Sequence, residues 1–239
     1  CVMKALIFDC DGVLADTERD GHRVAFNRAF AEHGIDVEWD IEWYGQMLEV
    51  AGGKERLRHF FDQTSWPAAA GDDHEAYLAR LHADKTRNYK ALVASGSLPL
   101  RPGIKRIVDE AIAANLKLAV CSTASKGSVL AVMEQMGPER KAHFAEVLAG
   151  DVVAHKKPAP DIYLLALERL GVEPQECVVV EDSAIGMRAA LAAGIDCIVT
   201  TSAYTANEDF SGAGRVVRNL GEPPGDHVTI GDLKQICSR

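Results

Sequence analysis

One stretch near the N-terminus, Ala5–Leu14 with the sequence ALIFDCDGVL, constrains the fold of this chain more than any other. Its first half is a short apolar run, typical of a strand that is buried on both faces of a parallel sheet. Asp9 and Asp11 follow the run directly, and Gly12 comes next. Because they follow the strand, we expect these two carboxylates at the carboxyl edge of the sheet, where ligands of open α/β sheets bind.

The length, composition and net charge of the chain limit the classes of protein to which it can belong. The chain has 239 residues, 47% of them hydrophobic, which suffices for one large domain and a smaller insert. A net charge of −9 without any Lys/Arg block predicts no nucleic-acid partner, because phosphate-backbone binding needs a basic face. No apolar run is as long as a membrane span and no signal-peptide pattern precedes the first strand, so we expect a soluble chain without a membrane partner.

The six cysteines show no C-x-x-C pair and no metal-type spacing. Several lie in or beside apolar runs, which indicates buried free thiols in a reducing compartment. A redox-sensitive pair is the alternative interpretation.

Residues 16–94 carry only helical patterns after the first strand. Acidic residues open a helix at Asp16, as the helix dipole favours, and Gly34 ends it. We therefore predict an all-helical cap domain over 16–94, with the linker back to the core at 95–99.

From residue 101 onward, strands and helices alternate. The pattern predicts helices at 103–114, 129–136, 161–170, 183–193 and 231–237, and strands at 116–121, 146–149, 177–180, 197–199 and 216–217. Such alternation predicts a parallel sheet with helices on both faces. The fold class is therefore α/β, a Rossmann-like doubly wound core over 1–15 and 95–239 with the cap inserted.

Polar clusters follow the other predicted strands. Ser122 and Thr123 are able to hold phosphate oxygens at a helix N-terminus, although a hydroxyl there is also a common cap. Lys157 precedes a proline, where a solvated loop cation is the alternative. Glu181 and Asp182 leave a buried strand as paired acids, which are costly without a cation and so favour a metal or an acid/base role.

In this order, these clusters resemble the four-motif signature of the haloacid dehalogenase-like superfamily of phosphohydrolases. The resemblance implies that Asp9 is the phosphoryl-accepting nucleophile and Asp11 the general acid/base. It also implies that Ser122 and Lys157 bind the phosphate.

The same resemblance implies a Mg²⁺ site at Glu181 and Asp182, completed by Asp9 and the carbonyl of Asp11. Carboxylates that face a phosphate dianion repel it by about 4 kcal/mol per pair at ~4 Å and an effective dielectric near 20. A cation and Lys157 would offset that repulsion.

Substrate choice is expected to depend on the cap. The segment 52–56 resembles the cap loop of the β-phosphoglucomutase subfamily, where a cation grips a second, non-transferred phosphate. Lys54 matches that cation, with Gly53 and Arg56 beside it. A capped helix start is the alternative.

Three further contacts are implied by the same subfamily. Ser125 and Lys126 match a distal-phosphate contact on the core. His22, near Glu18 on the first cap helix, resembles a residue that links cap closure to Asp11, although a lone helix histidine is more often ordinary surface.

Six segments are similar to the CbbY subfamily of plant and algal type: 9–14, 52–56, 150–153, 156–158, 178–186 and 204–210. This resemblance implies dephosphorylation of xylulose-1,5-bisphosphate, a Rubisco inhibitor in carbon fixation, to xylulose-5-phosphate in the chloroplast stroma. A phosphosugar mutase is the main alternative. A catalytically dead binding module would be expected to lack one of the acids. We expect a monomer whose partner is a small sugar bisphosphate.

Overall fold

The structure, a computed structural model, describes residues 2–237. Contacts divide the chain into two units, a core formed by Cys1–Asp16 with Pro99–Arg239 and a cap formed by Thr17–Leu98. Each unit has its own interior and is described by itself.

The core is built on a six-stranded sheet in which every neighbouring pair is parallel. Its strands are β1 (Ala5–Phe8), β2 (Lys117–Ser122), β3 (Phe144–Ala149), β4 (Cys177–Glu181), β5 (Asp196–Thr200) and β6 (Arg215–Val217), in the order β3-β2-β1-β4-β5-β6. All four residues of β1 are buried because strands flank it on both sides and helices cover both faces. The predicted doubly wound α/β class is confirmed.

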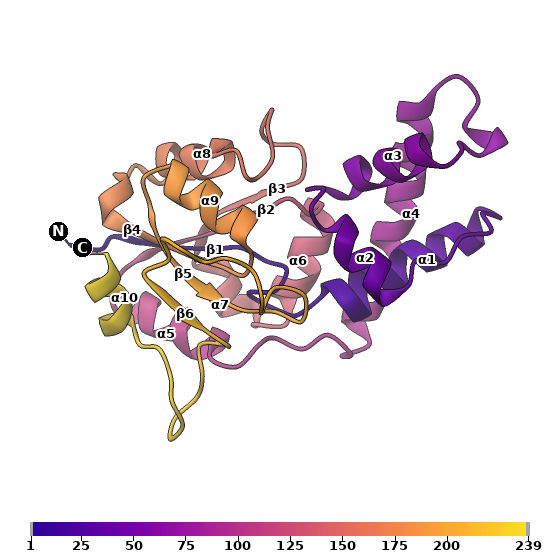
Figure 1. Cartoon of the computed structure of the whole chain (residues 1–239). Helices are drawn as coiled ribbons and strands as arrows, with labels where there is room; N and C mark the ends of the chain where they lie inside the picture. The colour runs from indigo at the N-terminus through magenta and orange to yellow at the C-terminus, as the bar shows by residue number, and fades with distance from the viewer. Residues whose placement is uncertain (1, 238–239) are drawn as a thin grey trace. The chain divides into compact units, whose positions relative to one another are not determined.

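Helices lie on both faces of this sheet (Figure 1). They are α5 (Ile104–Ala113), α6 (Lys126–Glu134), α7 (Pro138–Ala142), α8 (Asp161–Leu170), η3 (Pro174–Glu176), α9 (Ala184–Ala192) and α10 (Ile230–Ile236). Helices α8 and α9 cover one face, where Tyr163 and Met187 share a buried cluster with Ile7 and Val179. Helices α5 and α10 lie on the opposite face (Figure 1).

The cap contains only helices among its regular elements, as its pattern predicts. These are η1 (Glu18–His22), α1 (Arg23–Glu32), α2 (Ile41–Met47), α3 (Gly53–Gln63), η2 (Ala68–Ala70) and α4 (His74–Ala94). An aromatic cluster fills its interior, with the Trp39 ring 4.9 Å from Phe26 and 4.8 Å from Phe30. The Asp73 carboxylate accepts from the Ala76 amide and so caps α4.

Three local details differ from the sequence patterns. The first turn of the cap, η1, is a π-helix. Helix α6 begins at Lys126, three residues before the apolar pattern, because the Ser125 hydroxyl accepts from the Ser128 amide as an N-cap. Helix α7 has no apolar pattern, since none of its residues is buried, and it begins with Pro138 in its first turn.

The chain returns to the core later than the sequence pattern suggests. Residues 95–98 count with the cap because Leu98 is only 3% exposed. A β-carbon added to Gly21 would lie 2.8 Å from Leu98 Cδ1, so Leu98 packs directly on the π-helical turn. Asp16, in turn, counts with the core.

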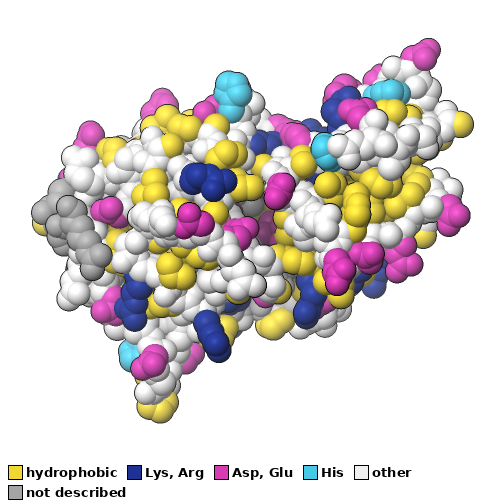
Figure 2. Space-filling view, viewed as in Figure 1, with side chains coloured by type: hydrophobic (Ala, Val, Ile, Leu, Met, Phe, Trp, Pro, Cys, Tyr) yellow, Lys and Arg dark blue, Asp and Glu magenta, His cyan; other side chains and the backbone are white. Residues whose placement is uncertain are grey.

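On the face seen in Figure 2, Lys and Arg side chains are scattered among Asp and Glu. Between residues 2 and 237, no helix combines the length and the apolar character needed to cross a membrane.

Candidate active site

The site lies where β1 ends, next to the end of β4. Phe8 is paired with Val120 on one side and Val180 on the other, which brings Asp9 level with Glu181. The Asp9 amide donates to the Val180 carbonyl at 2.9 Å. The strand order changes direction between β1 and β4, and ligands of doubly wound sheets bind at such a switch point.

Lys157 is the buried cation of this edge. Its Nζ donates to Asp9 Oδ1 at 3.0 Å, to Glu181 Oε1 at 2.6 Å and to the Cys121 carbonyl at 2.9 Å. These three bonds use all three donors of the ammonium group. Asp9 Oδ2 accepts no hydrogen bond from residues 2–237, which leaves this oxygen available for a reaction. The loop before α8 therefore delivers Lys157 to the centre of the site, and the solvated alternative does not apply because Lys157 is only 6% exposed.

Glu181 ends β4 and is held on both of its oxygens. Oε1 accepts from Lys157 and also from the Tyr163 hydroxyl on α8. Oε2 accepts from the Asp182 amide at 3.3 Å. A β-carbon on Gly186 would come within 2.0 Å of Oε2, so only a glycine in the first turn of α9 leaves room for this carboxylate.

Asp182 lies against the loop that follows β1. A β-carbon on Gly12 would fall 2.1 Å from Asp182 Oδ2, and Gly12 has a φ of +79°. Carboxylate oxygens of Asp9, Glu181 and Asp182 lie within 4.8 Å of one another, and all three residues are buried. Three oxygen ligands at this spacing suit a hard divalent cation such as Mg²⁺.

The charges of the cluster support a cation as well. The carboxylates of Asp9 and Glu181 contact the ammonium of Lys157, and Asp182 lies beside them. Burial, followed by the charge of Glu181, raises the pKa of Asp9 well above its ordinary value, although Lys157 acts in the opposite direction. Burial opposes the charged form of Lys157, but Asp9 and Glu181 outweigh it and raise its pKa. A divalent cation would keep Asp9 ionised, so the residues present fit the expected metal site.

The predicted phosphate-binding hydroxyls lie at the end of β2. Ser122 is buried, and its Oγ accepts from the Ala124 amide at 3.1 Å. Thr123 is half-buried beside it. Ser125 is occupied as the N-cap of α6, and Lys126, the first residue of that helix, is exposed. The structure thus places these residues at one helix N-terminus, a favourable environment for an anion.

The predicted substrate-binding residues of the cap loop lie at the start of α3 and differ in burial. Lys54 is the second residue of α3 and is half-buried. Arg56 is buried, and its guanidinium donates to the Met47 and Val50 carbonyls and to the Tyr44 hydroxyl. These bonds hold the Arg56 guanidinium within the cap scaffold, away from the role of a phosphate ligand. Gly53 permits close packing, since a β-carbon there would lie 2.4 Å from His82 Nε2.

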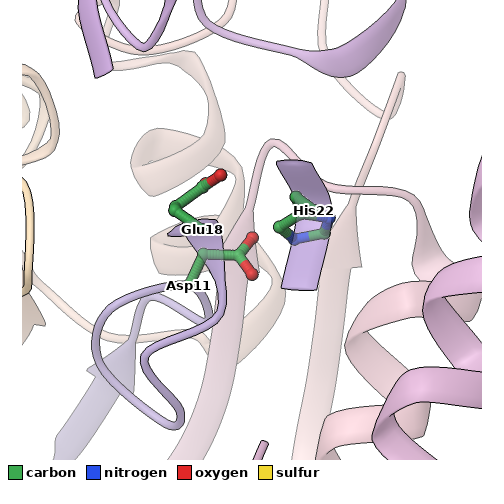
Figure 3. A group of neighbouring side chains, drawn as sticks. All are labelled: Asp11, Glu18 and His22. Carbon is green, nitrogen blue, oxygen red and sulfur yellow. The ribbon is translucent and has the colours of Figure 1, made fainter. Parts of the chain in front are cut away.

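Figure 3 shows Asp11 on the loop after β1, and Glu18 and His22 on η1. Glu18 Oε2 accepts from the Tyr44 hydroxyl at 2.6 Å. His22 is buried, which removes the ordinary-surface alternative, and its ring stacks on Tyr89 with centroids 4.0 Å apart. Its Nδ1 lies 2.6 Å from Nζ of Lys85, which is also buried. If Lys85 donates to Nδ1, the remaining proton of a neutral His22 is on Nε2.

Sequence reasoning missed three residues of this arrangement. Lys85 gives no signal, because a lysine on a long polar helix normally faces solvent. Tyr163 lies in the apolar stripe of α8 and reads only as core. Arg101 donates to the carbonyls of Gly12 and Thr201, so it ties the loop after β1 to the loop after β5.

The site and the sheet define a class of protein. The haloacid dehalogenase-like hydrolase family model matches residues 3–194, and the chain belongs to this family. Within the family it is similar to CbbY proteins. A CBBY-like protein of Arabidopsis thaliana is 50% identical over 231 residues, which cover 95% of this chain and 72% of that protein.

Solved structures agree with this relationship. CbbY from Rhodobacter sphaeroides in complex with phosphate superposes with a TM-score of 0.86 at 43% identity, covering 94% of this chain and 97% of that one. A mutant of the same protein in complex with xylulose-(1,5)bisphosphate gives a TM-score of 0.86 at 42% identity, with the same coverage. The predicted membership in a CbbY-like group of hydrolases is confirmed.

Proposed function

We propose that this protein is a Mg²⁺-dependent phosphatase that converts xylulose-1,5-bisphosphate to xylulose-5-phosphate through a phosphoryl group on Asp9. The observation that carries the proposal is the buried contact of Lys157 with Asp9 and Glu181, beside Asp182, at the switch point of the sheet. The bisphosphate complex of the similar Rhodobacter sphaeroides protein supports the choice of substrate.

In the first half of the proposed reaction, Asp9 Oδ2 attacks the phosphorus atom. The bond between phosphorus and the sugar oxygen breaks, and Asp11 protonates the departing alkoxide. Lys157 holds Asp9 by its other oxygen, Oδ1, which leaves Oδ2 directed by a fixed carboxylate plane. Ser122 and Thr123, with the amides at the start of α6, hold the oxygens of the transferred group.

In the second half, water attacks the phosphorus atom of the phosphorylated Asp9. Asp11, now ionised, takes a proton from that water, and the bond to Asp9 breaks to release inorganic phosphate. Asp9, Asp182, the Asp11 carbonyl and Glu181 are the proposed residues around Mg²⁺. When bound, the ion neutralises charge on the phosphoryl oxygens and lowers the repulsion described above.

Lys54 on the cap and Ser125 with Lys126 on the core are the proposed ligands of the second phosphate. The relative from Arabidopsis thaliana supports a plant-type protein, and we propose the chloroplast stroma as its location. We also propose that the protein acts as a monomer.

The test is phosphate release from a panel of sugar mono- and bisphosphates, with Mg²⁺ or with EDTA. Fast release from xylulose-1,5-bisphosphate alone, abolished by EDTA, is expected. A phosphosugar mutase would instead give an isomeric sugar phosphate with little free phosphate, which the same reaction mixtures reveal by chromatography.

A further inference from the structure

We propose that Tyr163 is a positioning residue for the phosphoryl-transfer site. Its hydroxyl and the ammonium of Lys157 both donate to one carboxylate oxygen of Glu181. The hydroxyl thereby weakens the attraction of Glu181 for Lys157, so that the ammonium stays close to Asp9 and the phosphate. This inference rests on the proposed function, because it assigns a role inside the same site.

Two donors converge on one oxygen in the structure. Lys157 Nζ lies 2.6 Å from Glu181 Oε1 but 3.0 Å from Asp9 Oδ1. The Tyr163 hydroxyl donates to the same Oε1. A neutral tyrosine hydroxyl carries one proton, so it is the donor of this bond and the carboxylate is the acceptor. The nearest partner of Lys157 is therefore a carboxylate whose charge is already partly satisfied.

Burial makes the hydroxyl hard to replace. Tyr163 is 0% exposed and Glu181 is 1% exposed, so water has no access to the position of a missing hydroxyl. The Tyr163 ring also lies under the ammonium, with Nζ 5.0 Å from the ring centroid. Phenylalanine at this position keeps the ring and its cation–π contact and removes only the hydrogen bond.

Glu181 has little freedom to compensate. Its Oε2 faces the Asp182 amide and the glycine of α9, where a single added carbon would come within 2.0 Å. Without the Tyr163 hydroxyl, Lys157 is the one remaining side-chain donor to Glu181 among residues 2–237. A carboxylate that has lost one of two donors attracts the other more strongly in a low-dielectric interior. Lys157 would then be held closer to Glu181 and contribute less charge to the phosphate.

The test compares Tyr163→Phe with the parent by calorimetric titration of inorganic phosphate at saturating Mg²⁺. We expect phosphate affinity to fall about tenfold, and kcat to fall by a similar factor with a smaller change in KM. Tyr77→Phe is the matched control, because Tyr77 in the cap has a buried hydroxyl without a hydrogen-bond partner among the described residues. It should leave the phosphate affinity unchanged.

A double-mutant cycle shows whether Tyr163 acts through Glu181. In a Glu181→Gln background the carboxylate charge is absent, so the additional change Tyr163→Phe should alter phosphate affinity by less than about twofold. An unchanged phosphate affinity in the single variant would overturn the proposal. An equal loss in both backgrounds would overturn it as well, because Tyr163 would then not act through Glu181.

Two measures keep the test decisive. If Tyr163→Phe does not fold, 4-aminophenylalanine at position 163 supplies a weaker donor at the same place, and an intermediate loss of phosphate affinity is expected. Parental affinity with that weaker donor would contradict the proposal. A parent protein that binds phosphate but releases none from any sugar phosphate would contradict the proposed function alone, since the phosphate titrations still test Tyr163.

Discussion

Gly12 lies so close to Asp182 that a β-carbon on Gly12 would come within 2.1 Å of Asp182 Oδ2. The loop that carries Asp11 is thus shaped by the carboxylate at the end of β4. Gly12→Ala should therefore displace Asp182 and also strain the backbone, whose φ is +79°. The expected result is at least a tenfold weaker Mg²⁺ affinity in calorimetry, together with a lower kcat.

Gly171→Ala provides the control for backbone strain. Gly171 also has a positive φ, +62°, but no atom lies within 4 Å of its added β-carbon. It should lose stability, by about 1 kcal/mol, while Mg²⁺ affinity stays at the parental value. Equal Mg²⁺ affinities in the two variants would show that the contact with Asp182 has no role in metal binding.

Asp9→Asn tests the nucleophile. The change is nearly isosteric, so the fold should persist, while turnover should fall by about three orders of magnitude or more. Steady-state phosphate release by a protein with a parental circular dichroism spectrum is the measurement. Substantial Mg²⁺-dependent activity in this variant would exclude Asp9 as the phosphoryl acceptor.

Asp182→Asn distinguishes a role of Asp182 in metal binding from a role in fold stability. It removes one of three crowded carboxylates, so the melting temperature without Mg²⁺ should equal or exceed that of the parent. The increase in melting temperature on adding Mg²⁺ should shrink, because the affinity falls by at least about tenfold. A full Mg²⁺-induced shift would argue against Asp182 as a ligand.

Lys54→Ala tests the proposed second phosphate contact. A charge-assisted contact contributes about 1.5 to 3 kcal/mol, so kcat/KM for xylulose-1,5-bisphosphate should fall by about ten- to a hundredfold. p-Nitrophenyl phosphate has no second phosphate and should lose little. A matching loss with both substrates would assign Lys54 a structural role.

Alkylation tests whether the buried cysteines are unreactive thiols. Burial raises the pKa of Cys177 to about 12, so only about one thiol in ten thousand is ionised at pH 8. Burial likewise raises the pKa of Cys121 and Cys197. Mass spectrometry should find these three unmodified by iodoacetamide in the native protein and fully modified after denaturation. Rapid modification in the native state would favour the redox-sensitive alternative.

The strands were predictable because their apolar runs are dictated by burial on two faces. Cys177–Glu181 is an example, buried at every residue. Helix α8 matches its predicted bounds, Asp161–Leu170, since its apolar stripe and terminal glycine coincide. Helix α7 was missed because a short exposed helix has no stripe to detect.

The placement of the strand-end acids was predictable for a similar reason, since parallel strands bring their carboxyl ends to one edge. The partners of those acids were not. Tyr163 contributes through one hydroxyl at the end of an otherwise apolar side chain, and the sequence does not distinguish it from core. Lys85 is buried against His22, which lies 63 residues away in the chain. Such contacts arise from packing, which periodicity does not encode.

The central position of β1 has a consequence for synthesis of the chain. Its partners are residues 117–120 on one side and 177–180 on the other. Asp9 therefore leaves the ribosome before either neighbouring strand, and β1 remains without a partner until more than a hundred further residues have emerged. Loop closure over such separations slows folding, and a nascent chain that ends before β4 lacks Glu181 and Asp182 altogether. A truncation product that ends before β4 therefore lacks two of the carboxylates proposed to hold Mg²⁺.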